Sequence, residues 1–288
     1  MNGIVIVDKP QDWTSQDVTA RLRRVFSTRR IGHGGTLDPM ATGVLPVFVG
    51  RATRGVEFFE HAEKTYETVL RLGIQTDTQD ITGTVLERRE VNVTQEQLLE
   101  NLNAFRGEIL QVPPMYSALK VNGQKLCDLA RKGKEVARPP RPVTIHELNL
   151  LSFDGQDAAL RVRCSKGTYI RTLCEDIGTA LGCLGTMASL RRTQAGDYTI
   201  AQAVPLQQLL EAEHPEEFLL PLDSMFLQYP ALTLTPNQET RCRNGNPFTH
   251  PAKNGTYRAY SQKGEFLMLA TVEDGTMRTV KSFFQVGE

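Results

Sequence analysis

The chain has 288 residues, a hydrophobic fraction of 40%, and 33 Lys and Arg balanced by 33 Asp and Glu. These values are ordinary for a soluble globular protein and exclude a disordered or collagen-like chain. The longest apolar runs are far shorter than the roughly 20 residues that span a bilayer, and we expect no signal peptide at the N-terminus. The five cysteines contain no C-x-x-C pair, so the sequence predicts reduced thiols in a cytoplasmic protein.

The charge is unevenly distributed although its sum is zero. Eight basic residues face three acidic ones over 9–54, eight face three over 106–141, and six face two over 161–192, whereas residues 57–100 hold ten acidic and four basic residues. Such blocks can fold into one positive face, which is the electrostatic mark of a nucleic-acid binder. An ordinary solvated surface explains the pattern equally well, so charge alone leaves both interpretations open.

The first predicted elements are a strand, a helix and a glycine-rich loop. Residues 3–7 (GIVIV) are short and β-branched, which is typical of a strand. Thr14 or Ser15 can cap a following helix. That helix has one apolar stripe, formed by Val18, Leu22 and Val25. Residues 31–43 contain four glycines and a proline, so the sequence predicts an irregular loop there, which leads into a strand over Val44–Val49.

Further along the chain, alternating and helical patterns predict three strands and two helices. Alternation and β-branched content predict strands over Lys64–Leu72, Val143–Phe153 and Ala158–Cys164. A capping box at Thr94 and an apolar stripe along Thr168–Leu181 predict the two helices.

The segment 112–142 differs from its neighbours. It contains five prolines, a short amphipathic piece at Leu126–Leu129, and a basic run at residues 131–134. We expect this basic, proline-bounded insertion to protrude from the core and to clasp a polyanion.

The residue pattern changes again after Asp223. Turn signals recur about every ten residues, from Tyr229-Pro230 and Pro236 to Asp274-Gly275. This spacing predicts a small all-β module. The sequence therefore predicts two domains, over residues 1–227 and 228–288.

Three segments carry residues suited to chemistry. The glycine-dense loop 32–39 presents His33 and Asp38, although an Asp before Pro is more often a turn or cap residue. This loop lacks the spacing of a phosphate-binding P-loop and has no partner at metal-ligand spacing, so no metal is expected. Residues 164–171 end a strand and begin a helix with Tyr169 and Arg171, which could hold an anion or simply cap the turn. Leu190-Arg191-Arg192-Thr193 would by itself be ordinary surface.

In this order, these segments resemble the bacterial tRNA pseudouridine synthase B family, which isomerises the uridine at position 55 in the T-arm of tRNA. The resemblance covers about residues 3–195. Its blocks are GIVIVDKP at 3–10, GHGGTLDPMATG at 32–43, RLG at 71–73, TDT at 76–78, PPMYSALK at 113–120, SKGTYIR at 165–171 and LRR at 190–192.

The resemblance implies a role for six residues. Asp38 matches the catalytic aspartate that all pseudouridine synthases share. Substrate-contacting positions are matched by His33, which fills the space of the flipped nucleotide, by Tyr66, which stacks on the base, by Arg171, which pairs with the catalytic carboxylate, and by Tyr169 and Leu190. One departure is Gly34, where the family motif often has Thr or Val.

The resemblance also implies a fold and a reaction. The expected fold class is α/β (α+β), with a mixed, largely antiparallel sheet, a thumb-like insertion at about 112–142, and a PUA-like RNA-binding domain at 228–288. The reaction needs no cofactor and no metal, and the partner is the T-arm of tRNA. We expect a monomer without a guide RNA or an obligate protein partner. A non-catalytic RNA-binding protein and a nucleoside-bond hydrolase are the alternative functions.

Overall fold

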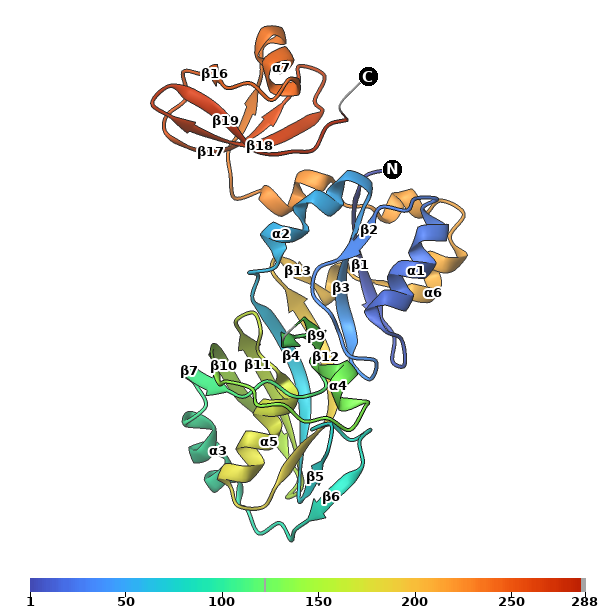
Figure 1. The fold of residues 1–288 in the computed structure, drawn as a ribbon, viewed down its shortest axis with the longest axis vertical. Helices are drawn as coiled ribbons and strands as arrows, with labels where there is room; N and C mark the ends of the chain where they lie inside the picture. Colours follow the sequence, from blue (N-terminus) through green and yellow to red (C-terminus); the bar gives the residue numbers. More distant parts are fainter. Residues whose placement is uncertain (122, 286–288) are drawn as a thin grey trace.

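A ten-stranded mixed sheet runs through most of the chain, and a separate five-stranded sheet lies beyond it at the C-terminal end (Figure 1). The computed structural model describes residues 1–121 and 123–285. The main path of the large sheet has the order β14-β1-β3-β12-β4-β11-β10-β7, with β2 added to β3 and β13 added to β12.

The strands of the large sheet include every strand that the sequence predicted within residues 1–227. Each predicted strand is confirmed, with bounds that differ by no more than a few residues. The strands are β1 (Gly3–Lys9), β2 (Ile31–His33), β3 (Thr42–Val49), β4 (Lys64–Leu72), β7 (Gly107–Gln111), β10 (Arg141–Phe153), β11 (Asp157–Cys164), β12 (Gly185–Ala195), β13 (Tyr198–Thr199) and β14 (Val204–Pro205).

Two small hairpins accompany the large sheet, namely β5 (Ile74–Thr76) with β6 (Val85–Arg88) and β8 (Lys120–Val121) with β9 (Gln124–Lys125). In the large sheet, the pairs β1/β14 and β3/β12 are parallel and the other pairs are antiparallel. The predicted fold class, a mixed and largely antiparallel sheet, is therefore confirmed.

The helices cover the large sheet in two groups (Figure 1). Near the N-terminus, α1 (Ser15–Val25) packs beside α6 (Leu206–Glu211), and α2 (Val56–Phe59) follows β3. At the other end, α3 (Gln95–Asn103) packs beside α5 (Ile170–Ala180), and α4 (Leu126–Ala130) lies in the 112–142 insertion. Among the described residues, no helix has the length and apolarity needed to cross a membrane.

Two capping boxes begin helices where the sequence predicted them. Thr14 caps α1 by accepting from the Asp17 amide, and Thr94 caps α3 by accepting from the Gln97 amide. Each partner side chain accepts from the capping residue in return, so two otherwise unpaired backbone donors are satisfied at each helix start.

The prediction that residues 31–43 form no regular element is wrong at both ends of that segment. Ile31–His33 forms β2, which pairs antiparallel with β3, and β3 begins at Thr42. The reason is tertiary, because the pairing partners Val47–Val49 supply hydrogen bonds that no local pattern shows. The irregular loop is therefore confined to residues 34–41.

Leu190-Arg191-Arg192-Thr193 by itself indicated ordinary surface, which is correct for Arg191 but wrong for Leu190 and Arg192. These residues lie in β12, which sits between β3 and β4 in the middle of the sheet. Arg192 is only 1% exposed and is among the largest fully buried side chains in the described part of the chain. Its neighbour Arg191 lies at the sheet surface and forms a two-point ion pair with Asp8, with N–O distances of 2.8 and 3.2 Å.

The C-terminal sheet has the order β15-β17-β18-β19-β16 and its own apolar core. Its strands are β15 (Ala231–Thr233), β16 (Phe248–Thr249), β17 (Gly255–Tyr260), β18 (Phe266–Glu273) and β19 (Thr276–Ser282). The prediction of an all-β module missed one helix, α7 (Pro236–Arg243). Pro236 is the first residue of that helix rather than a turn, because a proline at this position costs no backbone hydrogen bond.

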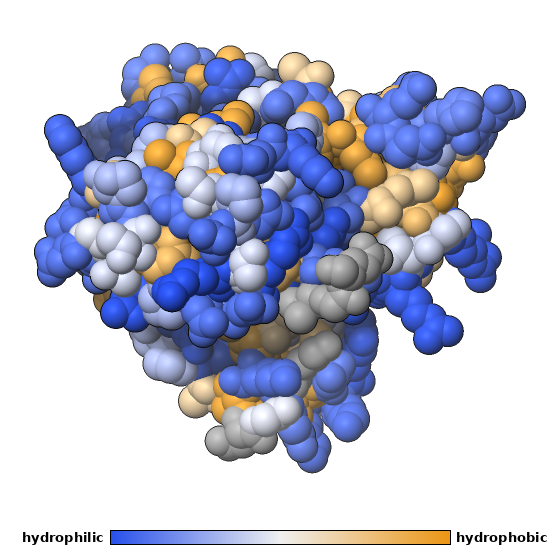
Figure 2. All heavy atoms as spheres, turned by 90° about the horizontal axis from the view of Figure 1, so that it is seen from above, coloured by the Kyte–Doolittle hydropathy of each residue, from blue (hydrophilic) through white to orange (hydrophobic). Residues whose placement is uncertain are grey.

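An aromatic cluster joins the two sheets. Phe226 contacts Phe58 of α2 at a ring-centroid distance of 5.3 Å and Phe283, which directly follows the last strand of the C-terminal sheet, at 5.7 Å. Ion pairs between Arg51 and Glu265, and between Lys281 and Glu57, lie around this cluster. Seen from the C-terminal end, the surface is largely hydrophilic and its apolar residues form separate groups (Figure 2).

Candidate active site

The loop that carries Asp38 is held from both sides by contacts with the β1–α1 region. The Leu37 amide donates to the Ser15 hydroxyl at 2.9 Å, and the Pro39 carbonyl accepts from the Asp12 amide at 2.8 Å. These bonds fix the backbone directly before and after Asp38. The Asp38 side chain itself remains 37% exposed, so the loop presents a positioned carboxylate to solvent.

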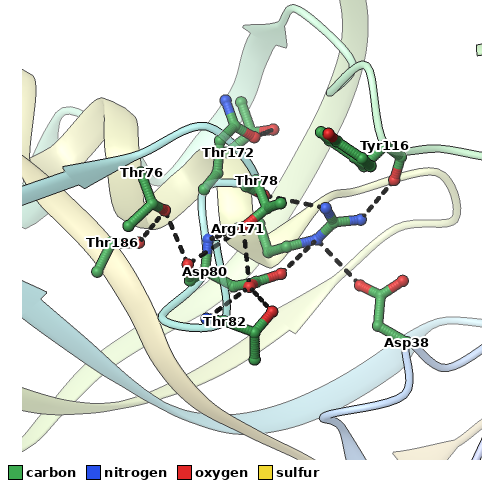
Figure 3. Close-up of polar contacts among 10 residues, drawn as sticks. Asp38, Thr76, Thr78, Asp80, Thr82, Tyr116, Arg171, Thr172 and Thr186 are labelled. Atoms are coloured by element: carbon green, nitrogen blue, oxygen red, sulfur yellow. Dashed lines mark hydrogen bonds and ion pairs between the residues drawn. The ribbon is translucent and has the colours of Figure 1, made fainter. Parts of the chain in front are cut away.

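Arg171 contacts this carboxylate from the first turn of α5 (Figure 3). Its Nε lies 3.0 Å from Oδ2 of Asp38, while its two terminal nitrogens donate to the carbonyls of Thr78 and Tyr116 at 3.1 and 2.8 Å. The arginine side chain is only 5% exposed. A buried guanidinium with every nitrogen occupied has a fixed orientation, so it holds the carboxylate at one place.

Asp80 lies on the other side of the guanidinium, with Oδ2 4.0 Å from Arg171 Nε. The Oδ1 atom accepts from the Thr82 amide and hydroxyl at 3.0 and 2.6 Å and from the Thr78 hydroxyl at 2.9 Å (Figure 3). With its side chain only 8% exposed, Asp80 is a buried anion satisfied by hydrogen bonds. It balances the charge of Arg171 from the interior, whereas Asp38 does so from the solvent side.

The two predicted tyrosines flank this ion pair. Tyr66 lies in β4 opposite Arg192 of β12, and burial raises the pKa of its phenol although Arg192 opposes that change. Tyr169 caps α5, and its backbone amide and carbonyl bond the side-chain amide of Gln111 at 3.1 and 3.2 Å. Burial also raises the pKa of the Tyr169 phenol. Both rings therefore stay neutral and offer half-buried aromatic surface near Asp38, which contributes electrostatically to both.

His33 ends β2 at the start of the loop. Burial lowers the pKa of its imidazole, and the nearby Arg192 lowers it further. The Nδ1 atom is buried and has no hydrogen-bond partner among the described residues. His33 is therefore held as a neutral ring directly before the Asp38 loop.

Leu190 differs from the other predicted residues because it is a core residue. It lies in β12 opposite Thr68, is 8% exposed, and belongs to the main apolar cluster. The structure thus brings Asp38 and Arg171 into direct contact, places Tyr66 and Tyr169 around them, and leaves Leu190 with a small exposed fraction at the sheet.

Sequence reasoning missed three polar residues that support the site, namely Asp80, Lys9 and Arg192. Arg192 donates to the carbonyls of Val44 and Gly35 at 2.7 and 3.1 Å and so ties β12 to the loop. A signal for Lys9 and Arg192 was present, because both lie in the segments that carry the family resemblance. No local pattern shows that these charged side chains are buried.

Lys9 lies beneath the loop and is fully buried. Its ammonium donates to the carbonyls of Pro10, Trp13 and Pro39 at 2.9, 2.6 and 3.2 Å. Burial lowers the pKa of Lys9 to about 8, although the charge of Asp38 partly opposes this. The lysine thus links the end of β1 to the residue that follows Asp38.

This lowered pKa predicts how stability depends on pH. The folded-state pKa of Lys9, about 8, lies below the usual 10.5, so the unfolded chain binds more protons between those pH values. Stability then rises with pH in that window. We expect the free energy of unfolding of wild type, relative to Lys9→Met, to increase by about 1 kcal/mol per pH unit from pH 8 to 10. Urea unfolding at several pH values measures both slopes, and equal slopes would contradict the assignment.

The fold was compared with solved structures. A structure described as an H/ACA RNP bound to a substrate RNA containing 2'-deoxyuridine has a TM-score of 0.73 and 23% identity, covering 98% of this chain and 85% of that one. A structure described as an archaeal box H/ACA sRNP Nop10-Cbf5 complex has a TM-score of 0.71 and 25% identity, covering 98% of this chain and 86% of that one. The fold is that of the pseudouridine synthases.

Sequence comparison gives the family. Residues 23–170 match the TruB family pseudouridylate synthase N-terminal domain, and residues 171–227 match the tRNA pseudouridylate synthase B C-terminal domain. The chain is 46% identical to a tRNA pseudouridine synthase B of Stutzerimonas stutzeri, over 96% of this chain and 93% of the relative. It is 39% identical to that of Clostridium kluyveri, over 98% and 100%. The chain belongs to the TruB family of pseudouridylate synthases and is an isomerase.

Proposed function

We propose that this enzyme converts the uridine at position 55, in the T-arm of tRNA, into pseudouridine, with Asp38 as the nucleophile. The observation that carries the proposal is the partly exposed Asp38 carboxylate held 3.0 Å from the buried Arg171 guanidinium. The relatives named above, which carry the name tRNA pseudouridine synthase B, support tRNA as the substrate.

The reaction needs one carboxylate and no external reagent. The N1–C1′ glycosidic bond breaks, the uracil turns while it stays bound, and a C5–C1′ bond forms. C5 then loses its hydrogen as a proton and N1 gains one, so atoms and electrons balance. Asp38 can attack C1′ of the sugar or C6 of the base, or remove a sugar proton, and each route requires an oriented anion. Arg171 supplies that orientation as a positioning residue.

The target uridine is stacked inside the RNA and must be extruded, which costs a few kcal/mol. We propose that Tyr66 stacks on the extruded base and that His33 fills the vacated space. Two features support these roles: the half-buried neutral Tyr66 ring and the His33 imidazole at the end of β2, where the Asp38 loop begins. Tyr169 and Leu190 would complete the wall around the base from α5 and β12.

The RNA is held by other parts of the chain in this proposal. Residues 1–227 form the catalytic domain, and its insertion 112–142 acts as a thumb over the RNA. Residues 228–288 form a PUA-like domain that binds another part of the tRNA. Support for the thumb comes from Tyr116, whose carbonyl accepts from Arg171, because this contact places the insertion beside the site.

A charge reversal tests the thumb. Lys132 and Lys134 are exposed in the turn after α4 and form no ion pair within the described ranges. Changing both to Glu should weaken tRNA binding and lower the slope of log affinity against log salt by about 1 to 2, since each lost phosphate contact removes about 0.7–0.9. Binding titrations at several salt concentrations measure this slope. An unchanged slope would mean that the insertion does not touch RNA.

We propose that the chain acts as a monomer without guide RNA or protein partner, in the cytoplasm. Purified protein and an unmodified tRNA transcript should then suffice for full conversion. If conversion required an added RNA or protein, this part of the proposal would be wrong.

The activity itself is tested with tRNA that carries tritium at uridine C5. Wild type should release one tritium per tRNA, because C5 loses its hydrogen when the base is rejoined there, and Asp38→Ala should release none. Release of free uracil would instead identify a hydrolase. Tight tRNA binding without tritium release would identify a non-catalytic RNA-binding protein.

A further inference from the structure

A hollow of about 370 Å³ opens on the surface where the turn before β2 meets the turn after β3. Its wall is formed by Met1, Asn2, Thr28, Arg29, Arg30, Gly50, Arg51 and Gln285. Three of these residues are arginines and none is acidic, so the hollow is strongly positive. None of the proposed catalytic or base-binding residues belongs to it.

The arginines are presented by an ordered backbone. The Gly50 amide donates to the Arg30 carbonyl at 2.8 Å, and the Arg51 amide donates to the Asn2 side chain at 2.7 Å. Gly50 has φ +64°, and a Cβ there would lie 2.3 Å from the Met1 carbonyl oxygen, so only glycine fits this turn. The turns therefore place the three arginine residues around one hollow.

Among the described residues, little negative charge balances these arginines. Arg29 and Arg30 are exposed, and within residues 1–121 and 123–285 neither side chain has a hydrogen bond or ion pair. Arg51 has one long contact, 3.7 Å to the partly exposed Glu265, which is a weak interaction in water. Like charges held together this way repel each other unless an anion lies between them.

The hollow lies between the Asp38 loop and the C-terminal sheet. In the β2/β3 pair, Ile31 faces Val49 beside the hollow, and His33 faces Val47 beside the Asp38 loop. Two residues of strand separate these pairs, or about 7 Å, and the hollow extends away from the loop. Gln285, which follows the C-terminal sheet, lines the same hollow. The hollow therefore lies on the seam between the two sheets.

We infer that this hollow, formed around Arg29, Arg30 and Arg51, binds the phosphodiester backbone of the tRNA outside the T-arm hairpin. This inference rests on the proposed function. Guanidinium groups match phosphate oxygens in two-point hydrogen bonds. The lining has no aromatic ring on which a base could stack. The hollow therefore contacts the sugar-phosphate backbone and does not distinguish base sequences. An RNA that reaches from Asp38 to the C-terminal sheet crosses this seam.

The test compares two RNAs and two matched variants. Arg29→Glu with Arg30→Glu reverses two charges at the hollow. Arg88→Glu with Arg89→Glu makes the same change at the end of β6, at the opposite end of the molecule from the C-terminal sheet (Figure 1). Affinity is measured for full-length tRNA and for the isolated T-arm hairpin at several salt concentrations.

The hollow variant should bind full-length tRNA at least about tenfold more weakly, with a salt slope lower by about 1 to 2. Its affinity for the hairpin and its tritium release from the hairpin should match wild type, which also shows that the variant is folded. The control variant should bind both RNAs like wild type. Unchanged tRNA binding, an equal loss on the hairpin, or an equal loss in the control variant would each overturn the inference.

Failure of the proposed function gives a different result. If wild type released no tritium while tRNA binding still depended on Arg29 and Arg30, the isomerase proposal would fail and the phosphate site would stand. If tritium release were normal and binding were independent of both arginines, the isomerase proposal would stand and the phosphate site would fail.

Discussion

Replacing Asp38 by Asn should lower turnover on tRNA by at least about 10⁴-fold while changing tRNA affinity by no more than about tenfold. The substitution keeps the shape of the side chain and removes its negative charge and nucleophilicity. The 37% exposed carboxylate lies at the solvent end of the ion pair with Arg171, so its loss affects the transition state more than docking. Single-turnover tritium release and binding titration measure the two quantities.

Asp157→Asn is the matched control for that variant. Asp157 also pairs with an arginine, Arg71, through two short contacts. Asp157 begins β11, and Arg71 lies at the end of β4 that is far from Tyr66. Its turnover should stay within about twofold of wild type. Turnover by Asp38→Asn within tenfold of wild type would refute the role of Asp38.

Replacing Arg171 by Met should lower the free energy of unfolding by about 3–5 kcal/mol, because Asp80 is then left as a buried anion without its positive partner. The carbonyls of Thr78 and Tyr116 also lose their donors. At temperatures where the variant is folded, kcat should fall by about 100-fold or more with a small change in KM, since Asp38 loses its orientation. Urea unfolding and steady-state kinetics measure these effects.

A second substitution separates charge from packing in this variant. Adding Asp80→Asn to Arg171→Met should recover part of the lost stability, because the unpaired buried charge is removed, but it should not recover kcat. Arg163→Met serves as the control, since Arg163 pairs with Glu63 and Glu147 at a partly exposed site and should contribute less than about 1 kcal/mol. Equal losses in the Arg163 and Arg171 variants would contradict the buried network.

The sequence predicted the regular elements best where the local signal and the tertiary environment agree. Lys64–Leu72 alternates in sequence and has a buried face in the sheet, so the strand was predicted with its observed bounds. The N-cap at Thr14 and the capping box at Thr94 also appear as predicted, because their bonds are local. β2 was missed because it is a glycine-rich segment that becomes a strand only by pairing with β3. α7 was missed because Pro236, its first residue, was taken as a turn signal.

The candidate site was predictable in its residues but not in its connections. The resemblance pointed to Asp38 and Arg171, and the structure brings them into contact. Asp80 carries no sequence signal of its burial, since its partners Thr78 and Thr82 are common polar residues in a loop. Arg192 was taken as surface because arginine is rarely buried, and only its place in the central strand β12 shows otherwise.

The order of strands in the large sheet has a consequence for how the chain folds. β12 comes late in the sequence, yet it lies between the much earlier strands β3 and β4. From β12, Arg192 donates hydrogen bonds to the carbonyls of Val44 and Gly35. A sheet closed by contacts between distant segments pays its loop-closure entropy before it gains stability, so it folds slowly. During synthesis, the Asp38 loop thus lacks its contact with Arg192 until residue 192 has left the ribosome. Arg171, the ion-pair partner of Asp38, is also synthesised long after the loop, so the loop obtains its full set of contacts only late in synthesis.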